Sequence, residues 1–192
     1  MQLKNAEEFI VTFLQNGLSP LLHYHDLAHT VGVRHSCLSL AREEGIINED
    51  DLVLLQTAAL YHDCGFVNVY DHHEEEGCRL AAEILPRFEY NEAQIQVICN
   101  MIMKTKLPQN PVTHLEEILC DADLDHLGRE DFDDIGKKLY EEWLATGKHI
   151  SEKEWNDIQI KFLSTHSYWT ASARAKRDQL KLIHLQHLNQ LV

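Results

Sequence analysis

The stretch DLVLLQTAALYHD, residues 51–63, decides the fold class. Wound as a helix it has almost no polar face, because its apolar residues are Leu52, Val53, Leu54, Leu55, Ala58, Ala59 and Leu60. A helix that is apolar all round is normally central and buried. Two polar residues, His62 and Asp63, end it, and Gly65 stops it soon after. We therefore expect a helical core with an imidazole and a carboxylate at the end of its central helix.

Outward from this stretch, helical periodicity runs nearly from end to end of the chain, with no convincing alternating strand and no internal repeat. Glycines and a proline mark several helix ends, and Ser151 with Glu154 has the capping-box pattern that starts a helix. The pattern predicts helices over about 5–16, 26–44, 48–62, 73–85, 91–105, 113–126 and 131–146, one beginning at 151, and a last one over 170–191. The prediction is an all-α globule of eight or nine helices rather than a simple four-helix bundle.

The length and composition fit one domain. The chain has 192 residues, of which 44% are hydrophobic and 25% are charged, and this is long enough to bury a sizeable core. Glycine and proline are few, so a long structureless linker is not expected. We predict a single domain over 1–192, in which residues 147–192 form a helical C-terminal extension packed on the core.

Charge and hydropathy exclude several classes of protein. The formal net charge of −14 argues against binding a nucleic acid polymer, although a bound cation can still attract a small anionic substrate. No stretch approaches the roughly 18 apolar residues of a membrane span, and the acidic, amphipathic N-terminus lacks the features of a signal peptide. The five cysteines include no CxxC pair, which favours reduced, buried thiols. We expect a soluble, cytoplasmic protein that does not bind membranes.

Four places in the chain carry polar residues suited to chemistry. They are His25 with His29, the His62–Asp63 doublet, the cluster from His72 to Glu76, and the acidic residues Asp121, Asp123 and Asp125. A spacing of four puts His25 and His29 on one face at the start of a helix. Taken singly, each has an ordinary structural reading: acids at 74–76 complement a helix dipole, and Asp123 and Asp125 can be surface residues.

The combination of His29, His62, Asp63 and Asp121 points instead to a metal. Asp121 follows Ile118, Leu119 and Cys120 in an apolar helix, where an ionised carboxylate is costly unless it is paired or binds a cation. Imidazole and carboxylate together suit Mn, Fe, Co, Ni or Zn, with Mg an alternative where carboxylates dominate. We predict one divalent ion held by these four residues.

The ordered pattern H…HD…D resembles the HD superfamily of metal-dependent phosphohydrolases. The matching words are LHYHDLAHT, ALYHDCG, HHEEEGCRLA and ILCDADLDHLG, and they extend over residues 22–128. The resemblance implies an all-α HD fold with the metal in a cleft between helices, bound by His29, His62, Asp63 and Asp121. It also implies that His25 is a proton donor and that Glu74, or Glu75 after a slip of one residue, acts near the metal-bound water.

The resemblance leaves the number of ions open. Branches that bind two metals carry further histidines between the doublet and the last Asp, and His72 or His73 could supply one of them. Asn100, Met101 and Met103 stand where some branches have another histidine. The signature of the cyclic-dinucleotide branch is absent. One ion is therefore the primary expectation, with a second as the alternative.

The function implied is hydrolysis of a small phosphoester, with nucleotides among the candidates, by metal-activated water. In that hypothesis Asp63 binds the metal and accepts a proton from the nucleophile, Glu74 positions the water, and His25 donates a proton to the leaving group. The partner would be a small phosphorylated molecule. The first alternative is a di-iron oxygenase of the same fold, which needs extra histidine ligands. The second is a non-catalytic signalling domain, which usually lacks the ligands.

Overall fold

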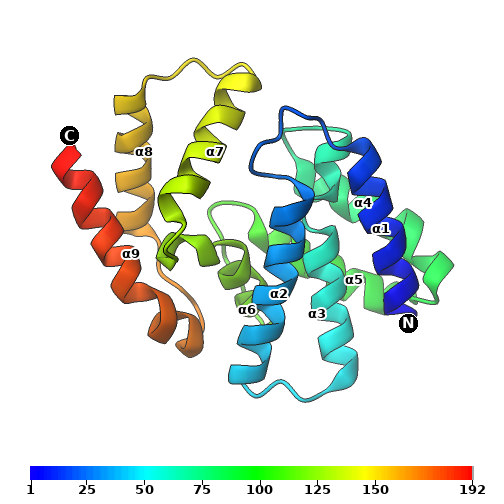
Figure 1. The fold of residues 1–192 in the computed structure, drawn as a ribbon. Coiled ribbons are helices and arrows are strands. Elements are labelled where there is room, and N and C mark those ends of the chain that lie inside the picture. The colour runs from blue at the N-terminus through cyan, green and yellow to red at the C-terminus, as the bar shows by residue number, and fades with distance from the viewer. Residues whose placement is uncertain (192) are drawn as a thin grey trace.

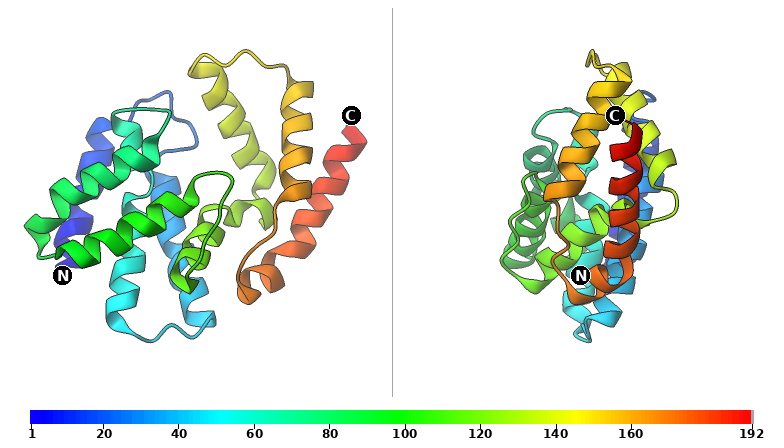
Figure 2. Two further views of the ribbon diagram at one scale, coloured as in Figure 1. Left: turned by 180° about the vertical axis from the view of Figure 1, so that it is seen from behind. Right: turned by 90° about the vertical axis from the view of Figure 1, so that its left-hand side faces the viewer.

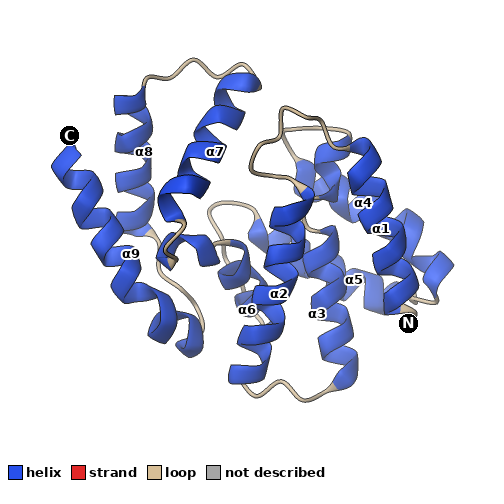
Figure 3. Cartoon of the chain, in the orientation of Figure 1, coloured by secondary structure: helices blue, strands red, loops and turns tan. Residues whose placement is uncertain are grey.

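Nine α-helices and three short 3₁₀ helices make up the fold, and no strand occurs within residues 1–191, the part of the chain that the computed structural model describes (Figures 1 and 3). In chain order they are α1 (Leu3–Gly17), α2 (Leu27–Glu43), α3 (Glu49–Tyr61), η1 (Cys64–Val67), α4 (His73–Ile84), η2 (Leu85–Phe88), α5 (Glu92–Thr105), α6 (His114–Asp123), η3 (Asp125–Gly128), α7 (Phe132–Ala145), α8 (Glu152–Thr165) and α9 (Ala171–Leu191). The prediction of an all-α chain is confirmed.

Local sequence signals set most helix boundaries. The Ser151 hydroxyl accepts from the Glu154 amide at the start of α8, and the Glu154 carboxylate accepts from the Ser151 amide at 2.8 Å, so the predicted capping box forms. The Asn48 side chain caps α3. One expected helix, 113–126, is interrupted, because α6 ends at Asp123 and a separate 3₁₀ turn begins at Asp125.

Helix α3 lies at the centre of the bundle, as its apolar circumference predicts. It packs against α1, α2, α5 and α6, and its last two turns are almost completely excluded from solvent. Leu55, Ala58 and Ala59 have 0% exposure. Burial of such side chains is the main favourable contribution to folding. The most apolar helix of the chain therefore lies in the core, and His62 and Asp63 lie at its buried C-terminal end.

The last three helices lie together on one flank of the molecule, yellow to red in Figures 1 and 2. Helix α9 packs against α8, η3 and α2, so the C-terminal part returns to the centre of the fold. Tyr168, Ala173 and Leu188 belong to the same buried apolar cluster as α1, α3 and α5. The C-terminal helices thus close one side of the region where α2, α3 and α6 meet.

Two further sequence expectations can be compared with this fold. All five cysteines are free thiols, three of them buried. Among the helices of residues 1–191, none combines the length and the apolar character needed to cross a membrane.

Candidate metal centre

The polar side chains of the site lie at the start of α2 and at the C-terminal ends of α3 and α6. Helix α2 begins next to Asp26, whose carboxylate accepts from the His29 amide at 2.8 Å and so fixes the first turn that carries His29. Helix α3 ends at Tyr61, followed at once by His62 and Asp63, and α6 ends at Asp123. Because α2, α3 and α6 pack against one another, these ends meet.

Four side chains converge there. His29 Nε2 lies 3.3 Å from His62 Nε2, 3.3 Å from Asp63 Oδ2 and 3.2 Å from Asp123 Oδ1. His62 Nε2 lies 3.1 Å from Asp63 Oδ2 and 3.5 Å from Asp123 Oδ1. Two ring nitrogens and two carboxylate oxygens therefore lie in one cluster. His29, His62 and Asp123 each offer a ligand atom within 4.8 Å of the others.

The second ring nitrogen of His62 supports a metal-binding role. Nδ1 lies 2.8 Å from the carbonyl oxygen of Ala59, which can only accept a hydrogen bond. Nδ1 therefore donates, and a neutral His62 ring turns the lone pair of Nε2 toward the carboxylates of Asp63 and Asp123. Metal-binding histidines typically use their second ring nitrogen in this way. A set of lone pairs aimed at one point fits a divalent cation.

The electrostatics of the cluster favour positive charge at its centre. Burial lowers the pKa of His62, but the charge of Asp63 and hydrogen bonds to Asp123 and Asp63 outweigh it and hold that pKa well above its usual value. Burial raises the pKa of Asp63, yet the charge of His62 and hydrogen bonds from His29 and His62 keep that pKa well below its usual value. The carboxylates are therefore ionised, and a cation can replace the protons on the rings.

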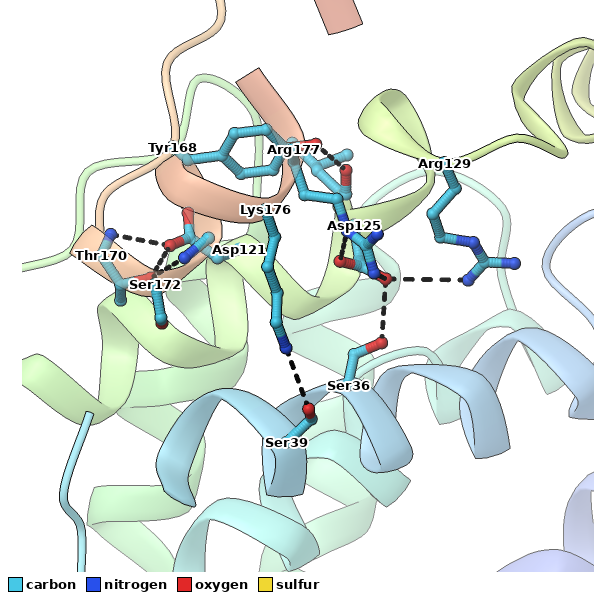
Figure 4. Close-up of polar contacts among 12 residues, drawn as sticks. Ser36, Ser39, Asp121, Asp125, Arg129, Tyr168, Thr170, Ser172, Lys176 and Arg177 are labelled. Carbon is cyan, nitrogen blue, oxygen red and sulfur yellow. Dashed lines mark hydrogen bonds and ion pairs between the residues drawn. The ribbon is translucent and has the colours of Figure 1, made fainter. Parts of the chain in front are cut away.

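The position of Asp121 corrects the sequence-based ligand set (Figure 4). Its Oδ1 accepts from the Trp169 amide at 2.8 Å, and its Oδ2 accepts from the Thr170 amide at 2.8 Å and the Thr170 hydroxyl at 2.7 Å. Residues two apart in an α-helix point about 200° from each other, so α6 turns Asp123 toward His29 and Asp121 toward the start of α9. The carboxylate of Asp121 holds α9, and Asp123 takes the place proposed for Asp121.

Glu74 lies beside this cluster, in the first turn of α4. Its side chain is 7% exposed and lines the same cavity as Asp63. Glu75, the alternative by a slip of one residue, instead forms an ion pair with Lys106 on the surface. Of the two acids, Glu74 is the one that faces the cluster.

His73 and His72 also differ in position. His73 Nε2 lies 3.6 Å from Asp63 Oδ1 and 3.5 Å from Glu74 Oε1, and its ring stacks on Phe66 with centroids 3.8 Å apart. The His72 side chain is 75% exposed. His73 is therefore the histidine of this pair that is able to extend the ligand set.

His25 is held by a residue from the C-terminal part of the chain. Its Nδ1 lies 2.5 Å from Oε1 of Glu142 in α7, and its ring stacks on Phe66 at 4.4 Å. Glu142 has 0% exposure, and it also accepts from the amides of Tyr24 and His25 at 2.9 and 3.0 Å and from the Tyr70 hydroxyl at 3.1 Å. Burial by itself raises the pKa of Glu142, but the hydrogen bond and the charge of His25 have the larger effect. The pKa of Glu142 is therefore below its usual value.

The sequence reasoning missed Asp123 as a member of the cluster and missed Glu142 altogether. Asp123 sits in the same DADLD run as Asp121, and the sequence carries no signal of which helix face points to the cluster. Glu142 follows Glu141 on an ordinary amphipathic helix, so its burial could be found only from the tertiary structure.

A cavity of about 590 Å³ opens from the cluster toward α7 and α8. At one end it is lined by His25, Asp63, Glu74 and Asp123, and at the other by side chains of the two C-terminal helices. A smaller cavity of about 180 Å³ lies on the α2 side, next to His29 and Arg129. The larger cavity is the space in which a substrate can reach the cluster.

A family model and a solved structure match this chain. The model of the HD domain family matches residues 26–127, which include all four converging side chains. Among solved structures, a predicted HD superfamily hydrolase from an uncultured Thermotogales bacterium is similar, with a TM-score of 0.64 and 18% sequence identity, over 98% of this chain and 90% of that one. No curated protein matches the sequence. The structural likeness extends over the C-terminal helices as well as the matched region.

Proposed function

The chain belongs to the HD domain family, and on this premise we propose that it is a metal-dependent hydrolase that cleaves a small phosphate ester. The observation that carries the proposal is the convergence of His29, His62, Asp63 and Asp123 at the end of a substrate-sized cavity. The similar Thermotogales protein is named as a hydrolase, which supports the same reaction class.

These four residues would hold the ion, with His73 and Glu74 next to it. Imidazole nitrogens mixed with carboxylate oxygens suit a first-row transition metal such as Mn, Fe, Co, Ni or Zn better than Mg. When bound, the metal would supply Lewis-acid activation of water and of a phosphoryl oxygen.

The protein's own residues would handle the protons. Asp63 and Glu74 both line the cavity, where either carboxylate can accept a proton from an attacking water. His25 borders the same cavity and is oriented through Nδ1, which leaves Nε2 free to donate a proton to the leaving oxygen. General acid–base catalysis by positioned groups typically contributes about 10²–10⁴-fold.

The position of His73 supports testing a second candidate function, that of a di-iron oxygenase. His73 lies close to Asp63 and Glu74 and could bring a second ion into the site. A centre with two irons would favour the oxygenase reading, in which a carbon substrate is oxidised and no phosphate is released.

The experiment is metal analysis combined with a screen of phosphomonoesters, phosphodiesters and nucleotides, on wild type, Glu74→Gln and Glu75→Gln. We expect about one transition metal per chain, and a loss of activity of about 10²–10⁴-fold in Glu74→Gln. The matched control Glu75→Gln changes a surface residue and should stay near wild type. Two irons without hydrolysis would move the assignment to the oxygenase, and failure of the wild type to bind any added metal would refute the centre itself.

A further inference from the structure

The far wall of the larger cavity has no part in the proposed chemistry. It faces the metal centre and is built by α7 and α8, outside the region matched by the family model. Its apolar members include Leu139, Trp143, Trp155, Ile158, Phe162 and Leu163. The cavity therefore has a charged end at residues 63–74 and 123 and an apolar end at the C-terminal helices.

Several of these side chains are not covered by the rest of the protein. Ile158 is 37% exposed, and Leu139 and Trp143 are half-buried. Trp155 is more buried, with its ring centroid 5.2 Å from that of Trp143. Apolar surface held open to water in a concave site is stabilised when an apolar ligand covers it.

Polar partners are scarce along this wall. Among its described residues, Gln159 supplies one carboxamide, whose Nε2 donates to Asn156 at 3.4 Å. Lys148 lies with its Nζ 3.5 Å from the centroid of the Trp143 ring. A nucleobase has several donors and acceptors on its edge, and each one buried without a partner is costly. The wall is therefore suited to an alkyl or aryl group and poorly suited to a base.

We infer that the substrate is a phosphoester whose organic group is largely apolar, with its phosphoryl group at the metal centre and its alkyl or aryl group against α7 and α8. This inference rests on the proposed hydrolase function and specifies its substrate class. Contacts remote from the reacting bond also contribute to catalysis, because binding energy there can be used to position the phosphoryl group.

The first test compares ethyl, butyl and hexyl phosphate, whose primary alkoxide leaving groups have closely matched reactivity. The ratio kcat/KM of the metal-loaded enzyme should rise with chain length, by up to about fourfold per buried methylene. Nucleoside 5′-monophosphates and glycerol phosphate should be poorer substrates than hexyl phosphate. A flat series, or a preference for nucleotides, would overturn the inference.

A matched pair of variants locates the effect on the wall. Leu139→Asn changes a cavity residue of α7, and it should flatten the dependence of kcat/KM on chain length. Leu144→Asn makes the same change on the same helix at a 42% exposed position outside the cavity, and it should keep the wild-type series. Equal slopes in the two variants would contradict the assignment.

A binding assay separates this inference from the hydrolase proposal. Ethyl-, butyl- and hexylphosphonate cannot be hydrolysed, and their binding can be followed by the fluorescence of Trp143 and Trp155. Affinity that rises with chain length supports the apolar wall, even if no ester is turned over and the hydrolase proposal fails. Affinity that is independent of chain length refutes the inference, even if phosphoesters are hydrolysed.

Discussion

Asp121 and Asp123 lie two positions apart at the end of α6 and have separate roles. Asp123 faces the histidines, and Asp121 accepts hydrogen bonds from the two residues that precede α9. Burial disfavours the charged form of both carboxylates. For Asp121 it raises the pKa above its usual value despite those hydrogen bonds. Residue type and burial alone cannot separate a ligand from a helix anchor here.

The same substitution at the two positions should affect metal binding differently. Asp123→Asn should abolish metal binding. Asp121→Asn should keep the metal but lower the free energy of unfolding by about 1–3 kcal/mol, because an amide cannot satisfy all three donors of Trp169 and Thr170. Metal content and urea denaturation of both variants check this. Loss of metal in Asp121→Asn alone would reverse the assignment.

His166 should make stability depend on pH. Burial, the charge of Lys181 and that of His126 lower its pKa to about 4. The unfolded chain takes up a proton on this ring near pH 6.5, whereas the folded chain does so only near pH 4. The stability associated with the neutral His166 ring is therefore fully present above about pH 6.5 and is lost as the pH falls toward 4. The free energy of unfolding should fall there by up to about 1.4 kcal/mol per pH unit.

The measurement compares urea denaturation of wild type and His166→Gln from pH 8 to 4. The variant cannot titrate at this position, so its stability should decline less steeply below pH 6.5 than that of wild type. The two slopes should agree above pH 7, which serves as the internal control. Parallel curves at all pH values would exclude His166 as a source of the acid sensitivity.

The packing of η1 on α4 depends on a glycine next to the metal centre. A Cβ on Gly65 would lie 2.0 Å from the carbonyl oxygen of His73, so the two backbones approach too closely for any side chain. Gly32, inside α2, has nothing within 4 Å of the corresponding position. One glycine is therefore required by packing between elements, and the other is not.

Replacement by alanine should separate these two glycines. Gly65→Ala must push η1 away from α4 and displace Asp63 and His73, so it should lower both stability and metal affinity, with a stability loss of a few kcal/mol. Gly32→Ala should raise the free energy of unfolding by about 0.5–1 kcal/mol, because alanine is the better helix former. Thermal denaturation with metal titration checks both. A Gly65→Ala protein with wild-type stability would contradict the packing argument.

Helix α7 should act on catalysis through His25. Glu142→Gln keeps the size of the side chain but replaces the carboxylate that faces His25 Nδ1. We expect kcat to fall by about 10- to 100-fold, typical of a residue that orients a functional group, while metal content is unchanged. Glu141→Gln, next to it on the exposed face of α7, is the matched control. If KM rises and kcat does not change, Glu142 does not position His25 for proton transfer.

At the scale of the whole molecule, the metal would join α2, α3 and α6, which come from separate parts of the sequence. A ligand that binds only the folded state stabilises it by about 2.7 kcal/mol at 100 times its Kd. For a chain of this length that corresponds to a rise in Tm of roughly 5–10 °C. Thermal denaturation with Mn²⁺ or Zn²⁺ should show the rise in wild type, and chelation should reverse it. Asp123→Asn should show no rise.

Local interactions in the sequence determined the helices and three of the four converging residues. Apolar periodicity, capping residues and glycine stops act within a few positions, so they predict each helix without knowledge of its neighbours. His62 and Asp63 follow from the apolar circumference of α3, since the end of a central helix must lie inside the fold. His29 is predicted from its position in the first turn of α2.

Only the tertiary structure decided the remaining features of the site. The rotation of α6 about its axis selects Asp123 over Asp121. That rotation is set by packing against α2 and by the hydrogen bonds that Asp121 accepts from Trp169 and Thr170, just before α9. Glu142 reaches His25 across 117 positions of the chain, and the apolar wall exists only because α7 and α8 dock opposite the metal centre. These relations depend on contacts between distant elements, for which neither local propensity nor spacing provides a signal.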